Sequence, residues 1–255
     1  MRESKLLMFN RHREIYNPFK SVFVLGGTSE IANQICLTLV ENGTKRIHFV
    51  SRNNLKQSIF INKLANNYDL EISVEEVDLL KYDSVKKPKI GIFDLYIIAV
   101  GYLGNTSLAN NDHLEALRIA NINYYSLIPW INSIVNEKRI CAPGAMWVLS
   151  SVAGDKGRPS NFHYGASKSA LTIFCEGLFY RCYQKPFKVR IIKAGFIDTL
   201  MTKGKAPKFL CASKKSLAKH LIKNPYREGI QYFPWWWFIV MRIILFLPRF
   251  LLSKL

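Results

Sequence analysis

The stretch SVFVLGGTSEIA, residues 21–32, contains the change of pattern that decides the fold. Residues 21–25 are mostly β-branched or apolar, which is typical of a central strand in a parallel sheet. Gly26 and Gly27 follow directly, and the spacing after them predicts an amphipathic helix that ends near Glu41. A glycine turn at a helix N-terminus presents free backbone N–H groups and the positive end of the helix dipole. The stretch therefore predicts a strand, a turn and a helix around a site for a pyrophosphate.

The same alternation of strands and helices continues along most of the chain. Further strands are predicted at residues 45–51, 71–77, 94–100, 145–150, 188–193 and 229–233, and helices at 55–67, 113–135, 164–184 and 213–224. This order predicts an α/β fold with a single doubly wound parallel sheet and ligands at the carboxyl ends of the strands. We expect a basic arm at residues 1–20, the α/β domain at 21–233 and a hydrophobic segment at 234–255.

A second stretch, SSVAGDKGRPSNFHYGASKSA at residues 150–170, carries candidate catalytic groups. Tyr164 and Lys168 are four residues apart, so on a helix their side chains share one face. A neighbouring ammonium lowers a tyrosine pKa, which predicts proton exchange with a substrate oxygen near neutral pH. Ser151 ends the preceding strand and is placed to hydrogen-bond the same oxygen. A tyrosine and lysine at this spacing occur by chance in many helices, but the serine and the glycine turn together favour catalysis.

With these motifs the chain resembles the short-chain dehydrogenase/reductase family, over residues 21–232. The family's catalytic serine, tyrosine and lysine are matched by Ser151, Tyr164 and Lys168. Asn123, in the sequence INY, matches the family asparagine that kinks a helix and holds a water beside the lysine. The resemblance implies a Rossmann fold and hydride transfer between a nicotinamide dinucleotide and a ketone.

The resemblance also implies where the cofactor binds. Gly26 matches the first glycine of the family pattern TGxxxGxG, whereas Glu30 and Ala32 replace the second and third, which weakens the match. The expected cofactor contacts are Gly26, Thr28, Ser29, Glu30, Ile31, Arg52, Asp78, Leu79, Ala99, Gly101, Tyr164, Lys168, Ile197 and Thr199. Arg52 follows the second strand, where an acid would favour NADH and an arginine could pair with the 2′-phosphate of NADPH. We therefore favour NADPH over NADH, although a solvent-exposed loop arginine would explain Arg52 equally simply.

The positive net charge of the chain limits the classes of binding partner that we expect. The 255 residues carry a formal net charge of +18, and many of the lysines lie in residues 203–223. This charge could face nucleic acid, an anionic bilayer or a phosphorylated substrate, or it could be only a solvated surface. No nucleic-acid-binding motif accompanies it, so we expect no nucleic-acid partner. The five cysteines have no zinc-site spacing, so no metal is predicted.

The last part of the chain is more apolar than is usual for a soluble enzyme. Residues 234–252, PWWWFIVMRIILFLPRFLL, are apolar nearly all round but short for a membrane span between their prolines. Three tryptophans at one end and spaced arginines suit a helix lying in the headgroup region. A helix buried in a homo-oligomer and a short span are the alternatives. Because the N-terminal residues lack a secretory signal, we expect a peripheral protein on the cytoplasmic side of an anionic membrane.

Within the family, LGGTSEIA at the first turn and FPWWWFIVMRIILFLPR at the tail are similar to the decaprenylphosphoryl-2-keto-ribose reductase type. That resemblance implies reduction of the 2-keto group of a polyprenylphosphoryl pentose to give polyprenylphosphoryl arabinose for cell-wall glycans. It also implies a flavin-dependent oxidase partner that makes the keto-sugar. Two alternatives remain, namely another membrane-associated lipid or steroid ketone reductase and a non-catalytic scaffold for the oxidase.

Overall fold

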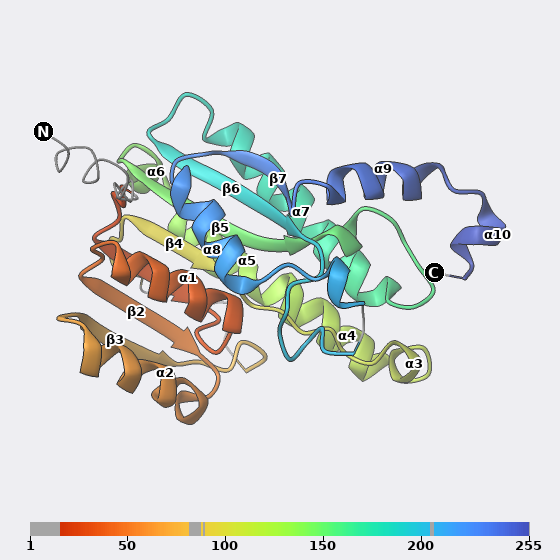
Figure 1. Ribbon diagram of the computed structural model, residues 1–255, viewed down its shortest axis with the longest axis horizontal. Coiled ribbons are helices and arrows are strands. Elements are labelled where there is room, and N and C mark those ends of the chain that lie inside the picture. Colours follow the sequence, from red (N-terminus) through yellow and green to blue (C-terminus); the bar gives the residue numbers. More distant parts are fainter. Residues whose placement is uncertain (1–15, 82–87, 89, 205–206, 255) are drawn as a thin grey trace, which may run out of the picture.

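The computed structural model describes residues 16–81, 88, 90–204 and 207–254 of the chain, and its centre is a seven-stranded parallel sheet (Figure 1). The strand order is β3-β2-β1-β4-β5-β6-β7. The strands are β1 (Ser21–Leu25), β2 (Arg46–Ser51), β3 (Glu71–Glu76), β4 (Leu95–Ile98), β5 (Gly144–Ser151), β6 (Phe187–Ala194) and β7 (Gly229–Phe233). The predicted α/β sheet is thereby confirmed.

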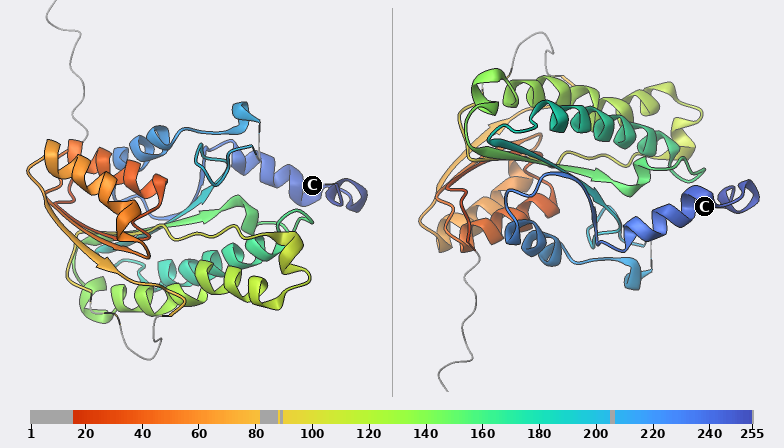
Figure 2. Two further views of the ribbon diagram at one scale, coloured as in Figure 1. Left: turned by 90° about the horizontal axis from the view of Figure 1, so that it is seen from below. Right: turned by 90° about the horizontal axis from the view of Figure 1, so that it is seen from above.

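Helices cover both faces of the sheet, so the sheet is doubly wound (Figure 2). One face carries α1 (Glu30–Glu41), α2 (Asn54–Asn67) and α8 (Lys214–Lys223). The other face carries α4 (His113–Asn123), α5 (Ile128–Ile134) and α7 (Phe162–Arg181). Two short helices, α3 (Thr106–Ala109) and α6 (Glu137–Ile140), lie in the connections.

Strand β5 shows how the sequence fills both layers. Trp147 and Leu149 belong to the core on the α1 and α8 side, whereas Met146 and Val148 belong to the core on the α5 and α7 side. Successive side chains of a strand point to opposite faces, so a strand buried on both sides must be apolar throughout. The run AMWVLS meets this condition, and it carries Ser151 to the carboxyl edge of the sheet.

One boundary differs from the sequence prediction. The helix expected over residues 113–135 is divided into α4, a 3₁₀ turn at Tyr125–Leu127 and α5. Pro129 lies in the first turn of α5, where a missing N–H is tolerated, and proline disfavours helix at the residue before it. Within the predicted basic arm, Phe19 is fully buried against Trp147, and residues 1–15 of that arm lie outside the described part of the chain.

The C-terminal segment forms two helices, α9 (Trp237–Phe246) and α10 (Arg249–Leu252). In both figures they project beyond the carboxyl ends of the strands. Trp237 and Met241 are buried against Val152, so one face of α9 is docked on the domain. The outer face exposes apolar side chains, namely Phe238, Ile239, Ile243 and Phe246. None of the helices in the described part of the chain has the length and apolarity needed to cross a bilayer.

A close contact at Gly195 holds α9 in place. A β-carbon added at Gly195 would lie 1.9 Å from Nε1 of Trp237. We expect Gly195→Ala to displace the indole and to lower the free energy of unfolding by about 1–3 kcal/mol, the usual effect of overpacking. Urea denaturation measures the free energy of unfolding, and a red shift of tryptophan fluorescence reports the displaced indole. Gly177→Ala in α7 is the matched control, because an added β-carbon there meets nothing within 4 Å and should stabilise the helix slightly. Equal effects of the two substitutions would contradict the contact.

Candidate active site

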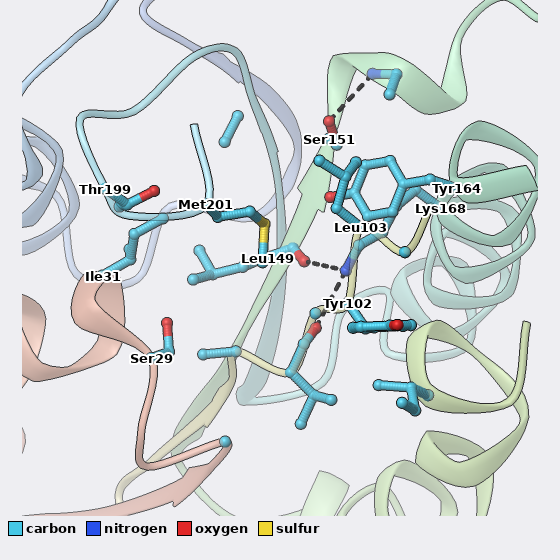
Figure 3. A pocket seen from close by; sticks show the side chains of 18 of the residues that line it. Ser29, Ile31, Tyr102, Leu103, Leu149, Ser151, Tyr164, Lys168, Thr199 and Met201 are labelled. Carbon is cyan, nitrogen blue, oxygen red and sulfur yellow. Dashed lines mark hydrogen bonds between the residues drawn. The ribbon is translucent and has the colours of Figure 1, made fainter. Parts of the chain in front are cut away.

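A cavity of about 1120 Å³ opens at the carboxyl ends of the strands. Its wall contains the turns that follow β1, β4, β5 and β6, together with the first turns of α1 and α7. Of the residues predicted from the sequence as catalytic or cofactor-binding, all but Asn123 line this cavity. Figure 3 shows Ser29, Ile31 and Thr199 on one side and Ser151, Tyr164 and Lys168 on the other.

The glycine turn has the geometry of a phosphate cradle. Gly26 has a φ of +95°, and a β-carbon there would lie 2.9 Å from backbone atoms of Ala99 and Val100. Only glycine therefore fits, because it tolerates positive φ and lets the turn pack against the end of β4. Ser29 caps α1 by accepting a hydrogen bond from the N–H of Ala32. The turn and the helix N-terminus can hold the pyrophosphate of a dinucleotide, and the cavity continues from there to Tyr164.

Glu30 stands where the family pattern has a glycine, and its carboxylate joins three segments. It accepts a hydrogen bond of 2.8 Å from the N–H of Leu200 and forms an ion pair with Lys214. Partial burial acts to raise the pKa of Glu30, but the bonds from Lys214 and Leu200 outweigh it and hold the pKa below its usual value. The negative charge at the phosphate cradle is therefore balanced by Lys214.

Lys168 lies on α7 with its side chain almost fully buried. Its ammonium donates to the carbonyl oxygens of Val100 at 3.1 Å and Leu149 at 3.2 Å (Figure 3). Burial lowers the pKa of Lys168 to about 8, because the charged form loses its hydration. The lysine remains mainly protonated at neutral pH.

Tyr164 lies one helical turn before Lys168, beside Ser151. Burial raises the pKa of Tyr164 to about 12, and hydrogen bonding with Ser151 only partly opposes this. The prediction that Lys168 lowers this pKa is wrong for this geometry, because the ammonium is directed at two carbonyl oxygens and lies 5.9 Å from the phenol ring centroid. The phenol keeps its proton at neutral pH and can act as an acid.

Ser151 ends β5 and begins a short 3₁₀ turn. Its hydroxyl oxygen accepts a hydrogen bond of 3.1 Å from the N–H of Ala153. This contact fixes the oxygen and leaves the hydroxyl proton to be donated either to the Tyr164 oxygen or to a ligand. Ser151 and Tyr164 thus provide two O–H donors on the same side of the cavity.

Asn123 does not reach the cavity surface. Its amide nitrogen donates to the carbonyl oxygens of Tyr102 at 2.7 Å and Ile119 at 2.8 Å, and its oxygen accepts from the N–H of Tyr102 at 3.0 Å. All three contacts are to backbone atoms, and the catalytic role of Asn123 stays a prediction. The helix does break directly after Asn123, but the amide holds the loop that follows β4.

Several cavity residues were not named by the sequence analysis, among them Arg158, Asn161, Met201 and Trp237. Arg158 and Asn161 lie inside the stretch 150–170, in which only Ser151, Tyr164 and Lys168 were assigned a function from the sequence. Trp237 was interpreted as part of a segment that meets a membrane or a homo-oligomer partner. The methyl group of Met201 lies 3.9 Å from the place that a β-carbon at Gly101 would occupy.

Comparisons with known proteins agree with this geometry. A family model described as short chain dehydrogenase matches residues 20–208. An uncharacterised oxidoreductase of Streptomyces coelicolor is 26% identical over 202 residues, which cover 72% of this chain and 75% of that relative. A 3-oxoacyl-[acyl-carrier-protein] reductase of Chlamydia muridarum is 25% identical over 191 residues, which cover 72% of this chain and 77% of that protein.

The fold is also similar to solved structures. A short chain dehydrogenase of Shigella flexneri complexed with NADP superposes with a TM-score of 0.73 at 17% identity. The match covers 86% of this chain and 98% of that one. At this level of identity the likeness concerns the fold.

The buried ammonium predicts a pH-dependent stability. The pKa of Lys168 is about 8 in the folded chain and 10.5 in the unfolded one, so between these values the unfolded state binds more protons and stability rises with pH. Relative to Lys168→Met, the wild type should gain about 3 kcal/mol of unfolding free energy between pH ~7 and ~10.5. Urea denaturation over this range measures the difference, with the exposed Lys215→Met as control. A pH-independent difference would show that the ammonium is not desolvated.

Proposed function

Because the chain belongs to the short-chain dehydrogenase family, and is an NAD(P)-dependent oxidoreductase, we propose that it reduces a ketone held between Tyr164 and Ser151. The observation that carries this proposal is the convergence of the two O–H donors with the Lys168 ammonium on one wall of the cavity. The phosphate cradle at Gly26 lines the same cavity.

The chain's own residues provide binding and proton transfer. The hydroxyl of Ser151 hydrogen-bonds the carbonyl oxygen and polarises it. The phenol of Tyr164 donates its proton to that oxygen as it gains alkoxide character, because the phenolate of a phenol with a pKa of about 12 is a weaker base than an alkoxide. Hydrogen bonding with Ser151, which acts to lower the pKa of Tyr164, stabilises the phenolate that remains. A bound nicotinamide supplies the hydride.

NADPH is the proposed cofactor. The exposed Arg52 follows β2 and lines the cavity, at the position where a dinucleotide fold contacts the adenosine ribose. A guanidinium there would pair with a 2′-phosphate. The similar Shigella flexneri structure contains NADP, which supports the same choice. Comparing NADPH with NADH in the assay below tests it.

The proposed substrate is a polyprenylphosphoryl 2-keto-pentose, reduced to a polyprenylphosphoryl arabinose for cell-wall glycan synthesis. The support is the resemblance of the first turn and of the tail to the decaprenylphosphoryl-2-keto-ribose reductase type. A flavin-dependent oxidase would supply the ketone. The alternative substrate for the same reaction is another lipid or steroid ketone. The name of one relative, the 3-oxoacyl-[acyl-carrier-protein] reductase, refers to an acyl ketone of this kind.

The test is an assay with a synthetic short-chain prenylphosphoryl 2-keto-pentose. We expect NADPH oxidation and a pentosyl phosphate product, and a loss of about 10²–10⁴-fold in Tyr164→Phe, the usual contribution of a general acid. Tyr180→Phe is the matched control, since that exposed tyrosine is on the same helix. A Tyr164→Phe variant that binds NADPH and sustains unchanged pathway flux would favour the non-catalytic scaffold for the oxidase.

We also propose that the outer face of α9 rests on an anionic membrane from the cytoplasmic side. Phe238, Ile239, Ile243 and Phe246 are exposed there, and Arg242 lies among them with its guanidinium over the Phe238 ring. Cations beside an exposed apolar face match the interfacial region of a membrane that contains anionic lipid. The proposed partner of this face of α9 is therefore a lipid surface. The alternative is that the face forms an interface with a second copy of the chain.

Vesicle binding separates these outcomes. The wild type should co-sediment with vesicles containing anionic lipid and less so at high salt, and Ile243→Glu should weaken binding about tenfold or more by placing a charge on the apolar face. Ile173→Glu is the matched control because Ile173 is an exposed isoleucine on α7. A wild type that ignores vesicles, or a dimer that Ile243→Glu dissociates, would contradict the membrane proposal.

A further inference from the structure

One methionine extends into the passage between the phosphate cradle and the catalytic groups. Met201 lines the cavity, and its methyl carbon lies 3.9 Å from the point that a β-carbon on Gly101 would occupy. The Lys168 ammonium lies 3.8 Å from that same point, so both groups are close to Gly101. Figure 3 shows the Met201 side chain between Thr199 on one side and Lys168 on the other. Met201 therefore occupies space that a dinucleotide held at the cradle would need to reach the catalytic groups.

The side chain of Met201 can leave this position at little cost in packing. It is 42% exposed, whereas Met241 on the inner face of α9 is 1% exposed. A side chain that is so little buried contributes little to the hydrophobic core. Methionine is also unbranched and flexible, so it can adopt another conformation without straining its neighbours. What places Met201 in the passage is therefore its backbone.

That backbone belongs to a compact turn at residues 199–203. The N–H of Thr199 donates to the hydroxyl oxygen of Thr202 at 3.2 Å. The N–H of Lys203 donates to the carbonyl oxygen of Thr199 at 3.0 Å. Because these bonds lie within the turn, the position of Met201 in the cavity depends on how the turn is attached to the rest of the protein.

Glu30 attaches this turn to the phosphate cradle. It is the first residue of α1, and its carboxylate accepts a hydrogen bond of 2.8 Å from the N–H of Leu200, the residue before Met201. Its second oxygen forms the ion pair with Lys214 on α8. The glycine of the family pattern would offer no carboxylate at this position. In this chain Glu30 therefore acts as a positioning residue for Met201.

A bound pyrophosphate would compete with the contact that Glu30 makes. The first turn of α1 offers free N–H groups and the positive end of the helix dipole to an anion. The phosphates of a dinucleotide would meet the like charge of Glu30 there, which is unfavourable for both anions. Lys214 can exchange the carboxylate for a phosphate oxygen, because an ammonium forms charge-assisted hydrogen bonds with either. Binding at the cradle thus weakens the attachment of Leu200 to Glu30.

We propose that Met201 closes the cofactor passage of the free protein, that Glu30 holds it there through the N–H of Leu200, and that dinucleotide binding releases it. The closed state lowers the apparent affinity for a dinucleotide, because only the open fraction of the protein can bind. The inference concerns cofactor binding, and it does not depend on which ketone is reduced.

The first test compares NADPH with ADP, which carries a diphosphate but lacks the nicotinamide riboside that must pass Met201. In equilibrium titrations, Met201→Ala should tighten NADPH binding about threefold to tenfold, which corresponds to a free protein that is open roughly a third to a tenth of the time. The affinity for ADP should not change. Phe209→Ala is the matched control, because Phe209 is an exposed apolar residue of the same connection between β6 and α8 but does not line the cavity.

The second test separates the charge of Glu30 from its contact with Leu200. Glu30→Ala removes both, whereas Glu30→Gln removes the charge and keeps an acceptor oxygen. Both variants should tighten ADP binding equally, but Glu30→Ala should tighten NADPH binding about threefold more than Glu30→Gln does. Adding Met201→Ala to Glu30→Ala should give little further gain, because both substitutions act on the same closed state. Glu41→Ala, at the exposed other end of α1, is the matched control.

Several results would overturn the inference. Weaker or unchanged NADPH binding by Met201→Ala would do so, because the methionine would then contact the cofactor or lie outside its path. Equal effects of Glu30→Ala and Glu30→Gln on NADPH would leave Glu30 with its charge alone and would also overturn it. Unchanged ADP binding by Met201→Ala shows that the variant is folded. The titrations contain no ketone, so a protein that reduces none would refute the proposed function and leave this inference intact.

Discussion

Lys168 Nζ donates to the carbonyl oxygens of Val100 and Leu149, which ties helix α7 to the ends of two neighbouring strands. Both contacts can form only when α7 crosses the carboxyl edge of the sheet with one particular rotation. That rotation also directs Tyr164, one turn earlier, toward Ser151. Burying the ammonium is unfavourable, as the lowered pKa shows, so the surrounding core must stabilise it. The position of the phenol thus depends on a charge that the fold holds away from water.

Burial acts on the two ionisable groups of the site in opposite directions. It raises the pKa of Tyr164 and lowers that of Lys168, because in each case the charged form is disfavoured. The result at neutral pH is a protonated phenol beside a lysine that is mainly protonated. This state is ready to donate a proton to a carbonyl oxygen, which is what reduction requires. Hydrogen bonding from Ser151 reduces the shift at Tyr164 and so lowers the cost of forming the phenolate.

The departures from the family pattern have structural explanations in this chain. Glu30 replaces a glycine, yet its carboxylate connects α1 with Leu200 and with Lys214 on α8. The apolar tail was expected to meet a membrane or a second copy of the chain, and in the structure Trp237 packs on Gly195 and lines the cavity. The C-terminal helix therefore has two faces with different surroundings. Its inner face shapes the site, and its outer face exposes Phe238 and Ile243.

The sequence by itself determined the order of strands and helices, the glycine turn at Gly26 and the pairing of Tyr164 with Lys168. These features are local, since apolar periodicity, a positive φ and a spacing of four residues are each set within one element. Only the tertiary structure decided the direction of the pKa shift at Tyr164, the true contacts of Asn123 and the presence of Arg158 and Trp237 in one cavity. Desolvation, and contacts between residues distant in the chain such as Gly195 and Trp237, depend on how separate elements pack, which a local pattern does not contain.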